Sequence, residues 1–338
     1  MATDGDRPVV GIPIGDPAGV GAEVAVRAAV AVDGCVPVLV GDADVIESAL
    51  DHSGVDSVLD VRSGLGDGEL PPPATGGLVV LDLNNVTEFS YGVVREEYGQ
   101  ASIEYLRRGL DLILEGTFDA ITAAPVHDAA VRRAIGSSQL AFVEEYLDLD
   151  TWTIVLVGDA LRVSHVSIHL SLREALDLVT TDRVADTIGI TDAWLRKLGV
   201  DDPRIAVAGL NPHAGEEGML GDEEDTEIRP AIERASNEGI DAEGPLSPDT
   251  VFASTAGGEY DCVVTMYHDQ GHIPFKTLEF QGAEFAGAAV LAGYPFPYTS
   301  PNHGPAFDIA GDGRASSESM RNALALATRM ASRSTAGQ

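Results

Sequence analysis

The chain has 338 residues, 44% of them hydrophobic, which is enough for a sizeable core and typical of two domains. It carries 54 acidic and 21 basic residues, a formal net charge of −33, which disfavours a nucleic-acid or anionic-membrane partner because phosphates need a basic face. No stretch approaches the roughly 18 to 20 apolar residues of a membrane span. A polar, acidic start and only two cysteines indicate neither a secretory signal nor a disulfide framework, so we expect a cytoplasmic protein.

The acidic residues are spread along the chain rather than gathered in a tail. Lysine occurs only at Lys197 and Lys276. Self-repulsion on this scale destabilises a compact state in dilute buffer, whereas concentrated salt screens it within a few ångströms. We therefore expect a protein from an extreme halophile, the alternative being an ordinary acidic enzyme.

Apolar runs alternate with segments of helical periodicity, which is typical of an α/β protein. In chain order, the expected strands are 8–14, 36–40, 78–83, 120–123, 153–157, 162–167, 204–208, 261–265 and 288–292. The expected helices are 21–31, 99–114, 172–179, 183–198, 226–238 and 316–330. The Gly- and Pro-rich segment 63–77 indicates a surface loop, and 332–338 indicates a frayed tail.

A Gly- and Pro-rich turn over 15–21 joins the first expected strand to a helix. Such turns present backbone N–H groups at a helix N-terminus, where anions bind. The turn is not the dinucleotide fingerprint, because no Gly-x-Gly-x-x-Gly is present. A ligand loop and a simple tight helix entry are therefore equally open.

Three histidines, His169, His213 and His268, each follow an apolar run that predicts a strand. The carboxyl ends of strands are where open α/β sheets hold their ligands. Three neutral imidazoles with an open fourth position suit a catalytic divalent metal, so we expect these side chains to converge. His165 and His272 lie near two of the three but in less constrained contexts, and we expect no role for them.

Three further polar residues are candidates for proton transfer. Lys276 is one of two lysines in a chain otherwise dominated by arginine, and only lysine can act as a compact, deprotonatable cation near a metal. Asp269 follows His268 directly. Asp249 is a candidate buried carboxylate, although a plain turn residue fits its Ser-Pro-Asp-Thr context at least as well.

Six motifs together resemble one family over nearly the whole chain. They are GDPAGVGAEV (15–24), SIHLSLREALDLVT (167–180), GLNPHAGEEGMLGDEE (209–224), GPLSPDTVF (244–252), MYHDQGHIPFK (266–276) and the short APVH (124–127). Their order and spacing are similar to those of the 4-hydroxythreonine-4-phosphate dehydrogenase family, which belongs to pyridoxine biosynthesis. GLNPHAGE and MYHDQG are highly specific signatures.

This resemblance implies a fold, a metal and a partner. The fold is the isopropylmalate dehydrogenase-like α/β/α architecture, with the active site in the cleft between two subdomains. We expect a cofactor-side subdomain over 1–125 plus 295–338, and a metal, substrate and dimerisation subdomain over 126–294. The metal, held by His169, His213 and His268, lies in the family at a homodimer interface, with one histidine from the partner subunit. Three histidines favour zinc or another borderline transition ion over magnesium, and manganese and cobalt stay open as alternatives.

A second resemblance concerns the segment 303–311. It is similar to the loop that wraps the adenosine half of the nicotinamide cofactor in isopropylmalate and isocitrate dehydrogenases, and its expected contacts are His303, Gly304, Ala306 and Asp308. An acid at the position of Asp308 accompanies NAD in those enzymes. A carboxylate accepts hydrogen bonds from both ribose hydroxyls and repels a 2′-phosphate, so we expect NAD rather than NADP.

The chain departs from the family at its substrate pocket. The family's Gly-His-Thr-Glu-Phe segment falls on a contracted stretch that contains Gln139 and Leu140, and a substrate-binding asparagine and arginine fall on Ala289 and Tyr298. Asp128 stands where the family has a lysine. Losing a histidine and an arginine removes charge-assisted hydrogen bonds to an anion, each worth about 1.5 to 3 kcal/mol. We therefore expect the usual phosphate recognition to be altered.

The resulting hypothesis is a metal-dependent NAD dehydrogenase that oxidises a secondary alcohol of a small hydroxy acid, with Lys276, Asp249 or Asp269 as proton acceptor. Decarboxylation of a β-keto acid product is a further step that the resemblance implies. Two alternatives are a non-redox enzyme of the same fold, similar to phosphate acyltransferases, and an inactive binding protein in which the metal only clamps a dimer.

Overall fold

The structure is a computed structural model that describes residues 7–65, 77–281 and 284–336. The chain divides into two compact units, Met1–Asp150 with Pro295–Gln338, and Thr151–Tyr294. The boundary expected at 295 coincides with this division, whereas the boundary expected after 125 lies within the first unit. The reason is that two short helices beyond 125 follow and pack near a long helix of the first unit, with the Arg107 guanidinium 5.5 Å from the centroid of the Phe142 ring.

The first unit contains a parallel sheet with strand order β3-β4-β2-β1-β5-β14. Its central strands are near-continuous apolar runs, as expected for strands that are buried on both faces. Parallel pairing places all carboxyl ends at one edge. The strands are β1 (Val9–Pro13), β2 (Val36–Gly41), β3 (Leu59–Arg62), β4 (Leu78–Asp82), β5 (Ala120–Thr122) and β14 (Tyr298–Pro301).

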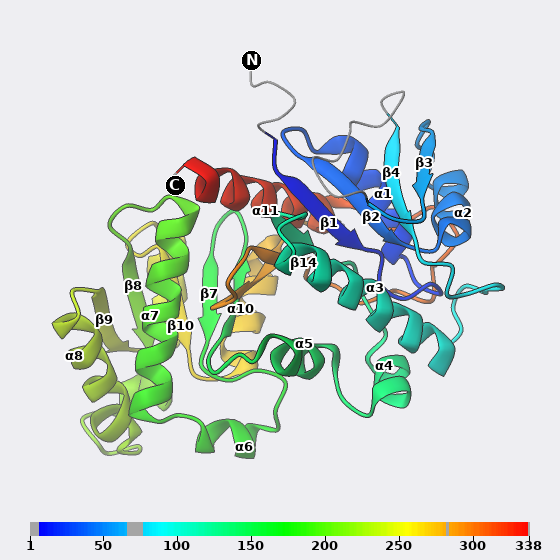
Figure 1. Cartoon of the computed structure of the whole chain (residues 1–338). Helices are drawn as coiled ribbons and strands as arrows, with labels where there is room; N and C mark the ends of the chain where they lie inside the picture. Colours follow the sequence, from blue (N-terminus) through cyan, green and yellow to red (C-terminus); the bar gives the residue numbers. More distant parts are fainter. Residues whose placement is uncertain (1–6, 66–76, 282–283, 337–338) are drawn as a thin grey trace. The chain divides into compact units, whose positions relative to one another are not determined.

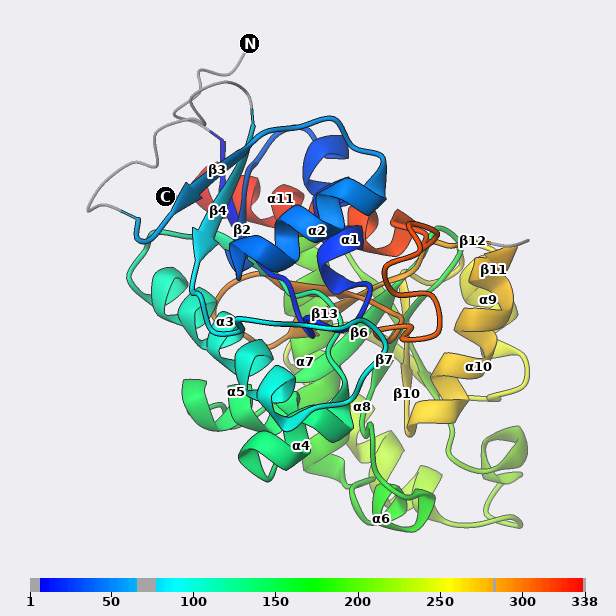
Figure 2. The ribbon, with the colours of Figure 1, turned by 90° about the vertical axis from the view of Figure 1, so that its right-hand side faces the viewer.

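Helices cover both faces of this sheet. Three of them pack together on one face, namely α1 (Gly21–Ala31), α2 (Ala43–Ser53) and α11 (Glu318–Ala336), while α3 (Glu96–Leu114) covers the other (Figures 1 and 2). Two short helices, α4 (Asp128–Ile135) and α5 (Gln139–Leu147), follow β5. The unit is therefore a three-layered α/β/α structure.

The second unit has a mixed sheet with strand order β13-β6-β7-β10-β8-β9. The β13, β6 and β7 pairings are antiparallel, and β7, β10, β8 and β9 run parallel. The strands are β6 (Thr153–Val157), β7 (Arg162–His165), β8 (Arg204–Ala208), β9 (Asp241–Leu246), β10 (Cys262–Thr265) and β13 (Ala288–Ala292), and a small hairpin pairs β11 (Phe280–Gln281) with β12 (Glu284–Phe285).

Helices again lie on both faces. The long α7 (Thr181–Leu198) packs on one face beside α8 (Arg229–Asn237), and α9 (Val251–Ala256) and α10 (His268–Glu279) pack on the other (Figures 1 and 2). The short α6 (Leu172–Asp177), the 3₁₀ turn η2 (Pro212–Gly215) and the π-helical turn η3 (Glu224–Ile228) complete the unit. No helix among the described residues is long and apolar enough to cross a membrane.

All nine expected strands and all six expected helices are present, most with ends within one or two residues. The frayed tail expected over 332–338 was wrong as far as Ala336, because α11 continues there after burying Met330 and Ala331. The final two residues lie outside the described ranges. The loop expected over 63–77 falls mostly on 66–76, which also lie outside them.

Candidate active site

Three parallel strands of the second unit end at the same edge of its sheet. β10 lies between β7 and β8 and pairs in parallel with both. His169, His213 and His268 each follow one of these strands. The topology therefore gives the three histidines the equivalent positions that the sequence predicted, at the edge where open α/β sheets hold their ligands.

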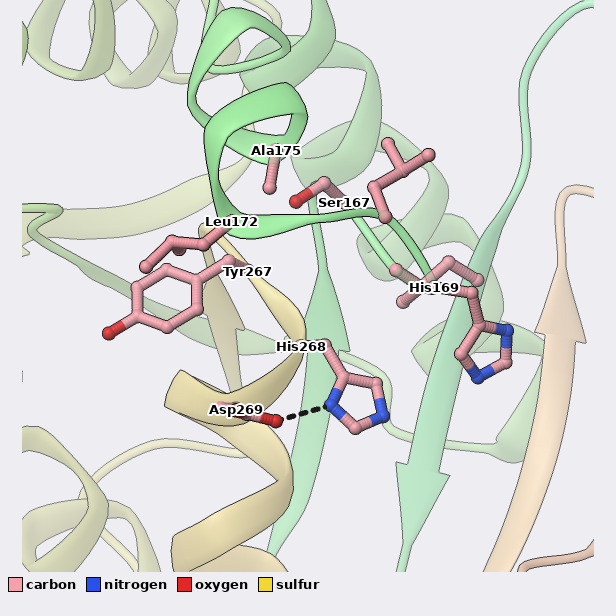
Figure 3. A pocket seen from close by; sticks show the side chains of 9 residues that line it. Ser167, His169, Leu172, Ala175, Tyr267, His268 and Asp269 are labelled. Carbon is pink, nitrogen blue, oxygen red and sulfur yellow. Dashed lines mark hydrogen bonds and ion pairs between the residues drawn. The ribbon is translucent and has the colours of Figure 1, made fainter.

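Two of these histidines, His169 and His268, line the same pocket (Figure 3). Their ring centroids are 5.6 Å apart and their planes are inclined by 41°. The cavity has a volume of about 230 Å³, and Leu170, Leu172 and Tyr267 are among its other lining residues. The pocket thus combines two imidazoles with an apolar lining.

A carboxylate fixes the imidazole of His268. Its Nδ1 lies 2.7 Å from Oδ1 of Asp269, the next residue of α10 (Figure 3). A carboxylate oxygen accepts, so Nδ1 carries the hydrogen and Nε2 keeps its lone pair. This is the arrangement by which metal-binding histidines are commonly oriented. Asp269 was expected as a possible proton acceptor, and its geometry favours this orienting role.

His213 does not join the other two within the chain. Its Nδ1 lies 4.0 Å from Oδ2 of Asp249, and both side chains are more than half exposed. Over 7–65, 77–281 and 284–336, no three histidine, cysteine, aspartate or glutamate side chains converge on a possible metal position. The expectation that three histidines meet was therefore wrong for a single chain, because the turn after β8 directs His213 elsewhere.

The spacing of His169 and His268 suits two ligands of one ion. A ring nitrogen binds Zn²⁺ at about 2.0–2.1 Å, so an ion would lie about 3.2 Å from the ring centroid, and two rings at a tetrahedral angle would have centroids about 5.2 Å apart. The observed separation of 5.6 Å is close to that value. The described residues of one chain thus fit two of the ligands and leave the remaining positions open.

Buried polar side chains hold the turn that carries His213. The carboxylate of Glu224 accepts hydrogen bonds from the backbone N–H of Asn211 at 2.6 Å and from its side-chain Nδ2 at 2.9 Å. Gln270 accepts from the N–H of Met266 at 2.7 Å and donates to the carbonyl of Gly209 at 2.7 Å. Sequence reasoning did not single out these side chains, although the GLNPHAGE and MYHDQG motifs contain two of them.

Residues of the candidate site adopt left-handed backbone conformations. His169 has φ 49°, and His213, Ala214 and Glu216 have φ of 53°, 53° and 47°. Such angles are uncommon for residues other than glycine, and each costs of order 1–3 kcal/mol. Strain of this kind clusters at ligand sites, because the surrounding structure must over-determine it. Two of the three expected metal ligands carry it.

Two further histidines lie beneath His268. The rings of His268 and His272 are stacked, with centroids 3.7 Å apart and planes inclined by 11°, and the ring of His165 lies 4.8 Å beyond. Burial lowers the pKa of His165 to about 4 and also lowers the pKa of His272 well below its ordinary value. Both rings are therefore neutral near pH 7. The expectation that they lie in less constrained contexts was wrong.

The other acid–base candidates are spread over two elements. Lys276 lies in α10, eight positions after His268, and is partly exposed. Asp249 is 62% exposed in the turn before α9, where Ser247 donates a hydrogen bond to its Oδ1 at 2.6 Å. This hydrogen bond lowers the pKa of Asp249. The expectation of a buried carboxylate was wrong, because a turn keeps this side chain in solvent.

In the first unit, the turn over 15–21 and the loop over 303–311 lie against each other. The N–H of Val20 donates to the carbonyl of Pro305 at 2.9 Å. A Cβ on Gly19 would lie 2.8 Å from the Cβ of Pro305, so only glycine allows this approach. The ring of Phe307 lies 4.7 Å from that of His127, at the end of β5. Asp308 is exposed and able to meet a ligand.

Two charged residues of α1 hold the segment just after this loop. Arg27 donates to the carbonyls of Ala315 at 2.5 Å, Gly313 at 2.6 Å and Ser53 at 3.0 Å. Glu23 forms an ion pair with Arg27 at 3.3 Å and accepts from the N–H of Ala315 at 3.2 Å. The 303–311 loop is thereby tethered at its far end to a buried helix.

The four positions expected to have lost substrate contacts are placed as follows. Gln139 and Leu140 open α5 and are partly exposed. Ala289 is buried in β13 and paired with Leu156, and Tyr298 is buried in β14. Burial raises the pKa of the Tyr298 hydroxyl strongly. None of the four lines the His169–His268 pocket.

Comparison with known proteins agrees with this geometry. The family profile for the pyridoxal phosphate biosynthetic protein PdxA matches residues 33–327. A Clostridium botulinum protein provisionally named D-threonate 4-phosphate dehydrogenase is 40% identical over 333 residues, covering 96% of this chain and 97% of its own.

Solved structures give the same result. The 4-hydroxythreonine-4-phosphate dehydrogenase of Klebsiella pneumoniae is 35% identical, with a TM-score of 0.83 over 96% of this chain and 98% of its own. The 4-hydroxythreonine-4-phosphate dehydrogenase of Burkholderia phymatum is also 35% identical, with a TM-score of 0.79 over 96% and 98% of the two chains. Sequence and fold therefore agree over nearly the full length, and the chain belongs to the PdxA family.

Proposed function

We propose that this chain is a divalent-metal-dependent NAD dehydrogenase that oxidises a secondary alcohol of a small four-carbon hydroxy acid. Membership of the PdxA family makes it an NAD-dependent oxidoreductase acting on a CH–OH group. The observation that carries the metal-dependent part is the His169–His268 pair, which lines an apolar pocket with its rings 5.6 Å apart. Two imidazoles at this spacing, one oriented by Asp269, suit a transition ion such as zinc better than magnesium.

We assign the metal to His169 and His268 of one chain and His213 of a second copy. A divalent ion bound there supplies Lewis acidity and lowers the pKa of an alcohol that reaches it. One chain offers only two convergent imidazoles among its described residues, and a catalytic zinc site takes three protein ligands. A homodimer with a shared site supplies the missing one.

Exposed apolar side chains beside the pocket support a homodimer. Leu170 is 46% exposed and Leu172 is 57% exposed, and both line the pocket. Leu176, one helical turn after Leu172, is 45% exposed. In a chain this acidic, apolar side chains that gather around a ligand site are best explained by an interface, because a second copy would remove them from water.

The proton from the substrate alcohol goes to Lys276 or Asp249. Asp269 is less suited, because its Oδ1 is engaged with His268. Asp249 lies beside His213, in solvent, with a lowered pKa that keeps it ionised. The 303–311 loop would hold NAD, which would supply the hydride acceptor. The chain's part in the reaction is thus to orient the alcohol and to remove its proton.

The substrate class follows from the relatives. The activities in the names of both relatives concern four-carbon compounds with a 4-phosphate. We propose a 4-phosphorylated hydroxy acid of the D-threonate type, bound by donors other than the residues at Gln139 and Tyr298. NADH formation with D-threonate and with its 4-phosphate tests this assignment, and carbon dioxide release shows whether decarboxylation follows. If the enzyme turns over only the free acid, the proposal of a phosphorylated substrate is wrong.

The shared metal site is tested by mixing two inactive variants. His169→Ala and His213→Ala should each lose bound metal and NADH formation. Refolded together in equal amounts, they should regain about a quarter of the wild-type activity, because half of the dimers are mixed and each mixed dimer has one intact site. His169→Ala mixed with His268→Ala is the control, and it should stay inactive because both changes fall in the same half-site.

Two results would contradict the proposal. Unchanged metal content and turnover in His213→Ala would show that His213 is not a metal ligand and that the three-histidine site is wrong. Stoichiometric metal with no redox activity toward any hydroxy acid would favour the metal-clamped binding protein. Family membership already disfavours an acyltransferase, since the relatives at 35–40% identity are named dehydrogenases.

A further inference from the structure

The two histidines beneath His268 have no part in the proposed ligand set. His165 ends β7 and is 1% exposed, and His272 lies in the first half of α10 and is 8% exposed. A buried imidazole loses its hydration, so its burial costs free energy unless other contacts compensate for it. The stacked arrangement of their rings with that of His268 indicates a function at the metal site.

The three rings form a column that runs from the pocket into the core. His272 follows His268 by four residues of α10, so the two side chains lie on one face of the helix. Their rings are nearly parallel, at 11°, with centroids 3.7 Å apart. The ring of His165 closes the column from the sheet, 4.8 Å from His272 at an inclination of 44°.

Backbone carbonyls fix the lower two rings. Nδ1 of His272 lies 3.2 Å from the carbonyl oxygen of His268, and Nδ1 of His165 lies 3.1 Å from that of Ile154. A carbonyl oxygen only accepts, so Nδ1 carries the hydrogen in both rings. Neither ring can then rotate without losing its hydrogen bond.

Gly271 allows the helix to lie this close to the sheet. A Cβ at Gly271 would lie 2.6 Å from Nε2 of His165 and 2.6 Å from Cγ1 of Val163. Any larger residue would displace His165 or lift α10. The column therefore depends on a glycine in a helix interior, where glycine costs about 1 kcal/mol relative to alanine.

We propose that His272, supported by His165, is a positioning residue that holds the His268 imidazole in the orientation needed to bind a divalent ion. This inference rests on the proposed function, since it concerns the same metal site. Asp269 fixes the His268 ring at its edge through Nδ1, and His272 fixes its face. With both constraints, only Nε2 of His268 is offered to the pocket.

Cobalt binding to the full-length chain tests this role. His272→Leu fills the buried position with an apolar side chain and removes the planar ring, and we expect it to weaken Co²⁺ binding about tenfold, as loss of a group that orients a metal ligand does. The visible absorption of the bound Co²⁺ should change in intensity, because the ligand geometry relaxes. His272→Phe restores a planar ring and should recover most of the affinity and the wild-type spectrum.

A purely structural role of His272 predicts different results. It would lower the thermal unfolding midpoint in His272→Leu and leave the Co²⁺ affinity and spectrum of the folded protein as in the wild type, which would overturn the inference. His52→Leu, at an exposed histidine of α2, is the matched control and should bind Co²⁺ as the wild type does. If His272→Leu does not fold, His272→Gln makes the same test, because glutamine can donate to the His268 carbonyl but has no ring.

The failure of this inference can be separated from that of the proposed function. His268→Ala should abolish Co²⁺ binding at the site. If it binds Co²⁺ as the wild type does, the metal site itself is misassigned. If His268→Ala loses Co²⁺ and His272→Leu does not, the metal site stands and the positioning role falls.

Discussion

Among single residues, Asp16 is the clearest case of a carboxyl group whose ionised form is disfavoured by burial. It is 1% exposed at the carboxyl end of β1, and its Oδ1 accepts a hydrogen bond from the N–H of Ala18 at 2.9 Å. Desolvation raises the pKa of this carboxyl from 3.8 to about 6, against a smaller lowering by hydrogen bonds and by His127. The folded protein therefore binds this proton more tightly than the unfolded chain does.

Asp16 should make stability fall as the pH rises. Its contribution is fully present below pH 3.8 and is lost as the pH passes 6. A difference of roughly two pKa units corresponds to about 3 kcal/mol. Asp16→Asn keeps the acceptor for Ala18 and removes the titration, so its free energy of unfolding should exceed that of the wild type by up to about 3 kcal/mol at pH 8 and converge with it near pH 4.

Urea unfolding at pH 4, 6 and 8 in molar KCl measures this difference. Asp128→Asn, which removes an exposed ion pair with Arg132, is the control and should change the free energy of unfolding by less than about 1 kcal/mol. A difference between Asp16→Asn and the wild type that does not vary with pH would contradict the prediction.

Asp308 sets the expected cofactor preference. Its side chain is exposed on the loop that packs against the turn over 15–21. A carboxylate there accepts hydrogen bonds from ribose hydroxyls and repels a 2′-phosphate. We expect kcat/KM to be at least tenfold higher with NAD than with NADP, a ratio that corresponds to a difference of only about 1.4 kcal/mol in transition-state stabilisation. Asp308→Asn should narrow this ratio, because it removes the negative charge. Equal efficiency of the wild type with both cofactors would show that Asp308 does not select.

At the scale of elements, α1 and the segment after the 303–311 loop act as one piece. Arg27 donates three hydrogen bonds to backbone carbonyls, and its ion-pair partner Glu23 is 3% exposed. Removing the guanidinium leaves three carbonyls without their donor and the buried carboxylate of Glu23 without its cationic partner. Such a loss is far larger than that of a surface ion pair.

Arg27→Gln should therefore lower the free energy of unfolding by about 2 to 4 kcal/mol. Arg132→Gln removes an i,i+4 ion pair of the same unit in which both side chains are more than half exposed, and should cost less than about 1 kcal/mol. Urea unfolding of the two variants in molar KCl gives the comparison. Equal losses would show that the α1 contacts contribute no more than a surface pair.

The sequence predicted most elements because buried strands are apolar runs. It missed β9, whose Asp241–Leu246 segment includes polar residues at the sheet edge, and β3 and β14, whose sequences LDVR and YTSP mix apolar and polar residues. It also missed α10, because Gly271 and Pro274 are poor helix formers and only packing against β7 and β10 compensates for them. Short helices such as α4 and α5 carry too few turns for a periodic signal.

The site was predicted in part for a similar reason. Strand ends placed His169, His213 and His268 at one edge, since βα alternation predicts parallel strands, whose carboxyl ends lie at the same edge of the sheet. Side-chain direction could not be predicted, because it depends on left-handed backbone angles at His169 and His213. The column below His268 was missed for the same reason: stacking between α10 and β7 is a property of packing and not of spacing.

For the whole molecule, charge is the dominant property. A formal net charge of −33 on 338 residues produces self-repulsion that no core contact cancels. Several of the arginine–carboxylate pairs are exposed, and such pairs contribute little each. Stability should therefore depend on the ionic strength of the medium more than on any one contact.

Salt should stabilise the protein strongly. We expect the thermal unfolding midpoint to rise as KCl increases from about 0.1 M to about 1 M, where the screening length falls from about 10 Å to about 3 Å. Sucrose at matched osmolality is the control, because it stabilises by exclusion from the surface and does not screen charge. If sucrose and KCl raise the midpoint equally, screening is not the cause and the halophilic interpretation fails.

The amide of Gln270 has a consequence for motion at the site. It joins Met266, just before His268, to Gly209, just before the turn of His213, and its two ends accept and donate in only one orientation. The amide thus links two segments through a hydrogen bond between residues 61 positions apart along the sequence, Gln270 and Gly209. A displacement of either segment should therefore be transmitted to the other. We expect the segments that carry His268 and His213 to move together.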